Sequence, residues 1–470
     1  MASLEPQQLF AGFGRCDITP ASNFPNGMWM AQKHARANGI HRRLYISCVV
    51  LGTEADAVAL VGYDLVLLSA PQVTAIREAI RARTGLPMDR IWLYVTHSHA
   101  GPVTQDFYDR EGAAEVAAYV SALPERSAQA AELAWQARRA ARVQTGIGQC
   151  HIGVNRDLNY RGRMITGPNL AGFSDPDVGV IRLDGLDATP IAAIVTYGCH
   201  PTFLGPENTL ISPDYPGVTR DVFESITAAP CLFLQAGAGN VGPLRGFLAE
   251  VTEVERCGHL LACAAAQTYF SLPIEGYPAT IDHVVESGAP LGIVREQPAS
   301  TVQQNFRALA RQVPLPTDNP GPTVYDSVEQ DLESARERVE RLKREGAAEP
   351  DIQLATQHLL RHRLRAERKR LYSAPEGVSL EVGALLIGKS CFISLACEPY
   401  AELGVAIKRR SPAEKTIFAG YEGPDVIYVA PSESYGEPRS MEVYNSPFGP
   451  RAANVLVEAA VSMLHELHAH

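Results

Sequence analysis

The sequence predicts a mixed fold of strands and helices, of class α/β or α+β. Three observations carry this prediction. Short apolar runs typical of buried strands occur at 44–51 and 57–68, split by a polar turn. Helical spacing follows at 71–84 and stops at a Gly-Leu-Pro segment. Strand and helix patterns then alternate along the chain, and pattern alone does not choose between the two classes.

The remaining elements follow from the same periodicities. Further strands are expected at 90–96, 143–148, 178–183, 191–197, 230–235, 380–387 and 389–396. Helices are expected at 112–142, 215–226, 251–269, 306–312, 400–409 and 452–468. Because proline breaks or starts a helix, we expect Pro124 to divide the 112–142 helix in two.

A strongly charged segment at 325–371 is predicted to be a helical hairpin on the surface, with a break at 346–350. Its basic run at 361–370 is interpreted as a solvated helix face, and anion binding is the alternative.

Composition limits the classes of function. The chain has 470 residues, 46% of them apolar and 20% charged, with a net charge of -10. These values indicate a globular protein of two domains or one large domain, and argue against nucleic acid as a partner.

No apolar run approaches the roughly eighteen residues of a transmembrane helix. Residues 1–8 lack the basic start and apolar stretch of a secretory signal, so a cytoplasmic location is expected. The nine cysteines form no CxxC pair, which indicates reduced thiols.

Two predicted strands end in histidines. His97 and His99 follow the 90–96 strand, and side chains two apart on a strand point the same way. His200 ends the 191–197 strand and precedes a proline, with Asp214 placed to cap or orient the loop that follows. Histidines at strand ends are typical of metal sites, although each taken alone is as readily a packing residue.

Two further segments carry oxygen ligands. Glu398 directly follows an apolar strand, where burying a carboxylate is costly unless it is paired or bound to a metal. The alternative role for Glu398 is a cap for the 400–409 helix. Tyr428 lies in the segment 425–431 and, taken alone, looks like an ordinary strand aromatic.

Nucleophilic catalysis is disfavoured. Cys199 and His200 are adjacent on a strand and face opposite ways, so the imidazole is badly placed to activate the thiol. A serine mechanism lacks the Gly-x-Ser-x-Gly elbow.

These segments, in this order, resemble the neutral, non-lysosomal ceramidases over most of their catalytic domain. The matching segments are 12–20, 39–44, Asp64, 96–102, Asn155 with Arg156, 236–243, and 427–429 with Glu433 and Tyr435. The segment 96–102 is the most specific, since Thr-His-Ser-His-Ala-Gly-Pro resembles the Thr-His-Thr-His-Ser-Gly-Pro of the family.

The resemblance implies a layered mixed-sheet sandwich flanked by helices, spanning residues 1–470, with 325–371 as an inserted hairpin. The C-terminal β-sandwich domain of the family is expected to be missing. It implies Zn²⁺ as the cofactor, held by His97, His200, Glu398 and Tyr428, with His99 and Arg156 as catalytic residues. The activity implied is hydrolysis of an N-acyl amide by metal-activated water, with His99 or Arg156 holding the oxyanion and His99 protonating the amine.

This sequence departs from the family pattern at several positions. The Gly-Gly-Tyr of the family after the histidine motif is replaced by residues 103–105, and its loop serine is Gly242 here. We therefore expect a small-molecule amide that is smaller and more soluble than ceramide. A zinc hydrolase of an ester, lactone or other C–O or C–N bond, and a binding protein without activity, are the alternatives. A homo-oligomer is compatible with the sequence, and manganese or iron would suit the same ligand types.

Overall fold

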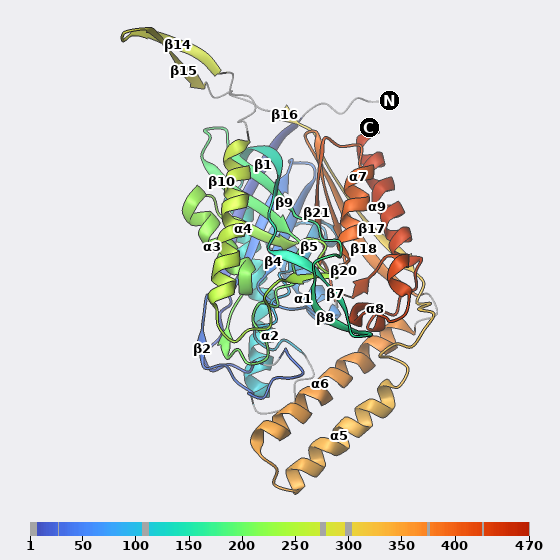
Figure 1. Ribbon diagram of the computed structural model, residues 1–470. Coiled ribbons are helices and arrows are strands. Elements are labelled where there is room, and N and C mark those ends of the chain that lie inside the picture. Colours follow the sequence, from blue (N-terminus) through green and yellow to red (C-terminus); the bar gives the residue numbers. More distant parts are fainter. Residues whose placement is uncertain are drawn as a thin grey trace.

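The computed structural model describes residues 7–26, 28–105, 112–272, 279–296, 303–373, 377–424 and 427–469 (Figure 1). The strands of the first half are β1 (Gln7–Asp17), β2 (Gly39–Ile40), β3 (Tyr45–Gly52), β4 (Ala57–Tyr63), β5 (Ile91–Val95), β6 (Arg139–Gln149), β7 (Gly153–Tyr160), β8 (Arg163–Asn169), β9 (Asp177–Gly185), β10 (Pro190–Tyr197), β11 (Leu210–Ile211) and β12 (Cys231–Gln235). Those that follow are β13 (Val241–Pro243), β14 (Ala279–Glu286), β15 (Pro290–Glu296), β16 (Gln303–Gln304), β17 (Phe306–Leu315), β18 (Val378–Ile387), β19 (Ser390–Leu395), β20 (Glu398–Pro399), β21 (Lys415–Ala419) and β22 (Tyr428–Val429).

The helices are α1 (Ala70–Thr84), α2 (Ala113–Gln136), α3 (Asp214–Thr227), α4 (Thr252–Ser271), α5 (Val328–Arg344), α6 (Glu349–Tyr372), α7 (Ala401–Arg410), α8 (Met441–Tyr444) and α9 (Ala452–His468), with short 3₁₀ turns η1 (Met88–Arg90) and η2 (Ser432–Tyr435). None of the helices within the described ranges is both long and apolar enough to cross a membrane.

Two mixed sheets stack face to face between two layers of helices. In hydrogen-bonded order the larger sheet runs β12-β10-β9-β6-β1-β3-β4-β5 and the smaller runs β17-β18-β19-β21. Helices α1 to α4 pack on the outer face of the larger sheet, and α7 and α9 pack on the outer face of the smaller one. The fold is therefore a mixed α/β sandwich, as the sequence predicted.

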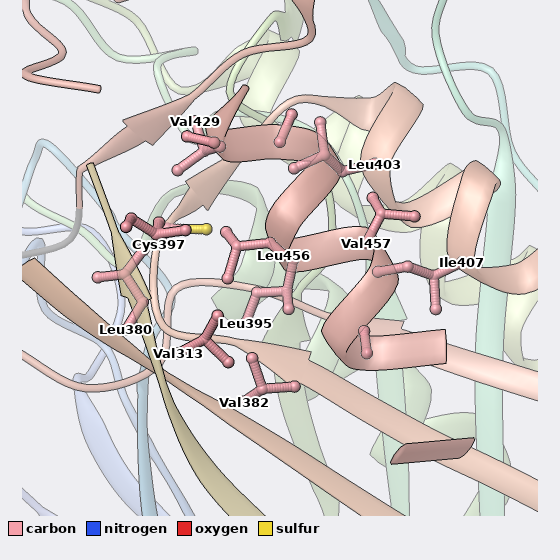
Figure 2. Packing of buried hydrophobic residues seen from close by; sticks show 14 of the residues in the cluster. Val313, Leu380, Val382, Leu395, Cys397, Leu403, Ile407, Val429, Leu456 and Val457 are labelled. Carbon is pink, nitrogen blue, oxygen red and sulfur yellow. The ribbon is translucent and has the colours of Figure 1, made fainter. Parts of the chain in front are cut away.

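Each interface of the sandwich is filled by apolar side chains. Between the two sheets, Trp92 and Tyr94 of β5 are fully buried in one cluster with Phe392 of β19. Figure 2 shows the outer core of the smaller sheet, where Val382 and Leu395 face the helices that carry Leu403 and Leu456. This burial fixes the position of β19 and of the segment that follows it.

The larger sheet curls until its two edge strands meet. Adjacent strands of a sheet rotate by about 20–25° each, so eight strands accumulate a large turn. Gly62 of β4 accordingly lies against β12, and a Cβ there would come within 2.6 Å of the Leu232 side chain. The Nε2 of Gln235 donates to the carbonyl of Thr96 at 3.1 Å. The residues after β5, β10 and β12 are thereby brought to one place.

Two predictions about elements were wrong. The segment 306–312 is not a helix but part of β17, which pairs with β18 along its whole length. Its Arg, Ala and Leu residues favour helices locally, and strand pairing overrides that preference. The other error concerns α2, which runs unbroken through Pro124 and ends at Gln136, after which β6 begins. Packing of α2 along α1 and β1 outweighs the hydrogen bond that proline removes.

Helices α5 and α6 form the antiparallel pair expected at 325–371, and the break between them falls at 345–348. In Figure 1, α6 lies next to the body of the protein and α5 lies on its outer side. Leu360 of α6 packs against the core of the larger sheet, and Tyr372 belongs to the core of the smaller one. The pair therefore bridges both halves of the sandwich.

Candidate metal centre

His97 is held in a strained conformation directly after β5. Its φ is 65°, in the left-handed region that residues other than glycine rarely adopt. The backbone N–H donates to the carbonyl of Leu65 at 2.9 Å, and Nδ1 lies 2.6 Å from the carbonyl of Val66. A carbonyl only accepts, so Nδ1 carries the proton and Nε2 presents its lone pair to the interior of the site.

His200 is positioned in the same way after β10. Its backbone N–H donates to Val241 at 2.9 Å, and its Nδ1 faces the carbonyl of Ala238 at 3.3 Å. The imidazole rings of His97 and His200 lie 4.7 Å apart between centroids. The Nε2 of His200 is therefore also left without a proton and directed into the same space.

Glu398 and Tyr428 complete the cluster from a third direction. They are direct partners in the parallel pair β20–β22, so their side chains share one side of it. Glu398 Oε2 lies 3.4 Å from His97 Nε2 and 4.0 Å from His200 Nε2. The Tyr428 ring stacks against that of His200 at 6.5 Å between centroids. The structure thus brings all four predicted ligands together.

The donor set fits a divalent cation such as Zn²⁺. Glu398 Oε2 is shielded from solvent and accepts no hydrogen bond from any residue that the structure describes. It faces the unprotonated Nε2 of His97, and two lone-pair atoms at 3.4 Å repel each other unless a proton or a cation lies between them. Two imidazoles and a carboxylate are ligands of the types that zinc takes, and the phenol oxygen of Tyr428 is a further oxygen donor.

Burial sets the protonation of these groups. It lowers the pKa of His97 to about 3 and raises the pKa of Glu398 to about 7, where the charges of Arg368 and Arg156 oppose the rise. Burial and, next, the charge of Arg156 hold the pKa of His200 well below its usual value. Both imidazoles are therefore neutral and able to bind a cation.

His99 is the third histidine of the cluster. Its ring lies 4.9 Å from His97 and 5.4 Å from His200, and nitrogen atoms of the three rings come within 4.8 Å of one another. Both ring nitrogens of His99 are shielded from solvent without a hydrogen-bond partner among the described residues. Burial, and then the nearby His97, hold the pKa of His99 well below its usual value. His99 therefore has a free nitrogen available for a ligand, a substrate or a cation.

Arg156 lies behind Tyr428 and does not face open space. Its guanidinium donates to Gly239 through Nε at 3.1 Å and to the Tyr428 hydroxyl through Nη2 at 3.2 Å. The carboxylate of Glu442 lies 2.8 Å from the same Nη2. Burial alone would lower the pKa of Arg156, but the charges of Glu442, Tyr428, Tyr421 and Glu398 together outweigh it and raise the pKa. These contacts suit a residue that orients Tyr428.

Sequence reasoning missed Tyr421, Trp29 and Glu442. Tyr421 has a φ of 58°, its ring lies 5.0 Å from that of His97, and its hydroxyl lies 3.3 Å from Nδ1 of His200. The Trp29 ring lies 4.9 Å from that of His99. Tyr421 had a signal of the kind that identified Glu398, a polar residue just after an apolar strand, but β21 was not predicted.

Two other predicted residues have supporting roles. The carboxylate of Asp214 accepts from the backbone N–H of Leu204 at 3.1 Å and of Tyr215 at 2.6 Å, which ties the loop after His200 to the start of α3. Cys199 is fully buried in the core under α3 and α4, and burial raises its pKa well above the usual value. In the segment 425–431, residues 425 and 426 lie outside the described residues.

The fold and this cluster define a mixed α/β sandwich with a candidate metal centre at its strand ends. No family model matches the sequence, and no curated protein matches it. Among solved structures, a ceramidase complexed with C2 has a TM-score of 0.69 at 17% identity, covering 98% of this chain and 76% of that one. The neutral ceramidase from Pseudomonas aeruginosa has a TM-score of 0.67 at 17% identity, covering 99% and 75%. The resemblance to neutral ceramidases is confirmed in the fold.

Proposed function

We propose that this protein is a zinc-dependent hydrolase that cleaves the amide bond of a small N-acyl substrate. The observation that carries the proposal is the buried approach of His97 Nε2 to Glu398 Oε2 at 3.4 Å, where Oε2 has no hydrogen-bond partner among the described residues. The shared fold of ceramidases supports amide chemistry over other uses of such a centre.

His97, His200, Glu398 and Tyr428 would hold the metal. When bound, zinc supplies Lewis acidity and lowers the pKa of a coordinated water to about 7. The chain supplies the rest of the chemistry. Arg156, held by Glu442, fixes the hydroxyl of Tyr428 through its hydrogen bond. Val66 and Ala238 fix the tautomers of the two histidines.

His99 is the residue placed to move protons. A free ring nitrogen of His99 accepts the proton of the attacking water and returns it to the amine nitrogen as the C–N bond breaks. Amides need this protonation because an amine anion is a poor leaving group. While it carries that proton, the His99 imidazolium can also stabilise the oxyanion, a contribution of roughly 3–4 kcal/mol per donor in other enzymes.

The test is metal content by elemental mass spectrometry for wild type, His97→Ala and His200→Ala, with the exposed His465→Ala as the matched control. We expect about one zinc per chain in wild type and the control, lost in both site variants. Hydrolysis of N-hexanoylglycinamide and of ethyl hexanoate then separates amide from ester chemistry. Absence of metal after zinc is supplied, or turnover of the ester alone, would contradict the proposal.

A further inference from the structure

Helix α6 presents arginines to the protein instead of to solvent. Arg361, Arg365 and Arg368 are spaced so that they share one face of the helix. Each is partly buried, whereas Arg370 of the same helix is exposed. The prediction that the basic run forms a solvated face is therefore wrong for these three, because α6 lies between α5 and the body (Figure 1).

A cleft lies between this face of α6 and Trp29, whose ring lies against His99 of the candidate metal centre. It is lined by Met28, Trp29, Met30, Gln105, Gln357, Leu360, Arg361 and Leu364. Trp29 forms one wall, and its ring contacts His99 at 4.9 Å between centroids. Arg361 lines the same cleft, and its charge acts on His99, so a molecule bound at this guanidinium lies close to the candidate metal centre.

The charge of Arg361, which lines the cleft, and that of the neighbouring Arg365 are not neutralised within the described part of the chain. Arg361 has neither a hydrogen bond nor an ion pair there, and its Nε is shielded from solvent. The Nε of Arg365 is likewise unpartnered, and its Nη2 reaches only the amide oxygen of Asn445 at 3.4 Å. Arg156, by contrast, has Glu442 at 2.8 Å. Burial, followed by repulsion from Arg365 and Arg368, lowers the pKa of Arg361 to about 10.

The cleft also holds a neutral donor that lacks an acceptor. The indole N–H of Trp29 is shielded from solvent and has no partner among the described residues. Leaving buried donors and a buried cation unpaired costs stability, so such groups are usually paired with something that binds them. An N–H donor and a cation that lie close together bind an anionic oxygen well. The planar guanidinium in particular is suited to a carboxylate or a phosphate.

We propose that Arg361 binds an anionic group of the substrate, with Arg365 one turn further along α6 adding to the positive charge, so that the natural substrate is an acidic amide such as an N-acyl amino acid. The apolar lining from Met28, Met30, Leu360 and Leu364 would accept the hydrocarbon part. This inference rests on the proposed amidase function, because only an amidase would hydrolyse the bound amide. Binding of the anion in the cleft does not itself depend on hydrolysis.

The experiment compares ligands that differ only in charge. N-hexanoylglycine, neutral N-hexanoylglycinamide and N-hexanoylaminoethyl phosphate are titrated calorimetrically into chelator-treated full-length protein, in which no hydrolysis competes. The variants are Arg361→Gln and Arg361→Lys, and Arg370→Gln removes the same charge from the exposed face of α6 as a matched control. The stronger of the two anionic ligands identifies the carboxylate or the phosphate as the group recognised.

Arg361→Gln is expected to weaken binding of the preferred anion by about ten- to a hundredfold and to leave the glycinamide unchanged. Arg361→Lys should recover part of the loss, and Arg370→Gln should match wild type. The melting temperature of Arg361→Gln should not fall, because the arginine has no internal partner to lose. Equal effects on charged and neutral ligands, or no effect on either, would overturn the inference. Charge-selective binding without hydrolysis of any amide by zinc-loaded protein would instead overturn the proposed function alone.

Discussion

At the scale of residues, the candidate centre is defined by polar atoms that the protein itself leaves unsatisfied. Buried polar atoms in folded proteins nearly always have hydrogen-bond partners. In the described part of this chain, Glu398 Oε2 and both ring nitrogens of His99 do not. The fixed tautomer of His97 makes its Nε2 another acceptor facing Glu398. The cluster is therefore a costly arrangement for the folded chain alone and a favourable one around a cation.

The substitution Glu398→Gln tests this cost. Glutamine keeps the shape, removes the charge that attracts a cation, and can donate an N–H to His97 Nε2. We expect the metal-free variant to be at least as stable as metal-free wild type. Zinc at a hundredfold excess over Kd should stabilise wild type by about 2.7 kcal/mol and so raise its melting temperature. The melting temperature of the variant should not change with zinc. Scanning fluorimetry with and without zinc measures both effects.

The control for that measurement is Glu414→Gln, whose side chain is exposed beside Lys389. It should respond to zinc as wild type does. A zinc-dependent rise in Glu398→Gln equal to that of wild type would show that Glu398 is not a ligand.

Asp157 predicts a pH dependence of stability near the same centre. Burial, and then the charge of Glu442, raise the pKa of Asp157 to about 8, while its carboxylate accepts from the Tyr400 hydroxyl at 3.1 Å. A raised pKa means that the folded state binds the proton more tightly than the unfolded state. Its contribution to stability is therefore complete at acidic pH and is lost as pH rises toward about 8, by at most about 1.4 kcal/mol per pH unit.

Asp157→Asn should remove this part of the pH dependence, since the amide keeps an acceptor for Tyr400 and cannot ionise. The melting temperature should fall less between pH 6 and pH 8.5 for the variant than for wild type. The exposed Asp187→Asn serves as the control, because its own pKa is lowered and lies outside this window. A decline in Asp157→Asn as steep as that of wild type would contradict the assignment.

At the scale of elements, the close packing of helix α2 explains the glycines of strand β1. These glycines lie in the segment that resembles the first motif of the ceramidase sequences. An ideal Cβ on Gly12 would lie 2.0 Å from the Ala134 carbonyl, and one on Gly14 would lie 2.1 Å from the Ala130 carbonyl. Helix α2 thus packs its backbone directly on β1. This contact explains a motif that local propensity does not, because glycine in a strand interior is otherwise unfavourable.

Gly14→Ala is expected to lower the free energy of unfolding by about 3 kcal/mol, since the clash is with helix backbone and cannot be relieved by a rotamer change. Chemical denaturation measures the loss. Gly436→Ala is the matched control, because that glycine has a negative φ and no atom within 4 Å of the added Cβ. A loss at Gly14 no larger than at Gly436 would show that α2 moves freely off the strand.

The same elements show how far sequence patterns reach. Strong periodicity located β3, β4, α1, α3, α4 and α9 within a few residues, because their apolar positions directly record which face is buried. Residues 306–312 were assigned to a helix because their composition favours one, while the partner that makes them a strand, β18, lies over sixty residues away. The candidate ligands followed from the family resemblance, whereas Tyr421 and Trp29 depend on approaches between distant loops that no local pattern records.

At the scale of the whole molecule, the net negative charge of the protein opposes the approach of an anion to the cleft. The chain carries a net charge of -10, so at long range it repels anions. Arg361 lines the cleft beside α6, and Arg365 lies one turn further along the same helix, so this side of the cleft is positive. Exposed charges are screened over a Debye length of about 8 Å at physiological salt, whereas groups shielded from solvent are screened much less. Added salt should therefore weaken the long-range repulsion more than the attraction inside the cleft.

Salt should consequently raise kcat/KM of the zinc-loaded protein for N-hexanoylglycine between low and physiological ionic strength, and leave kcat/KM for N-hexanoylglycinamide nearly constant. The rise is expected to be modest, about two- to fivefold, because local attraction persists while the global field is screened. Initial rates in a series of sodium chloride concentrations measure it, with potassium sulfate as a check on specific chloride competition for the arginines. The Arg361→Gln variant, which lacks the local attraction, should keep a rise of similar size on a lower baseline. A fall in kcat/KM with salt for the acidic substrate would show that attraction by the arginines dominates even at long range. Equal responses of the two substrates would show that neither the net charge of the protein nor the arginines of the cleft affect the reaction.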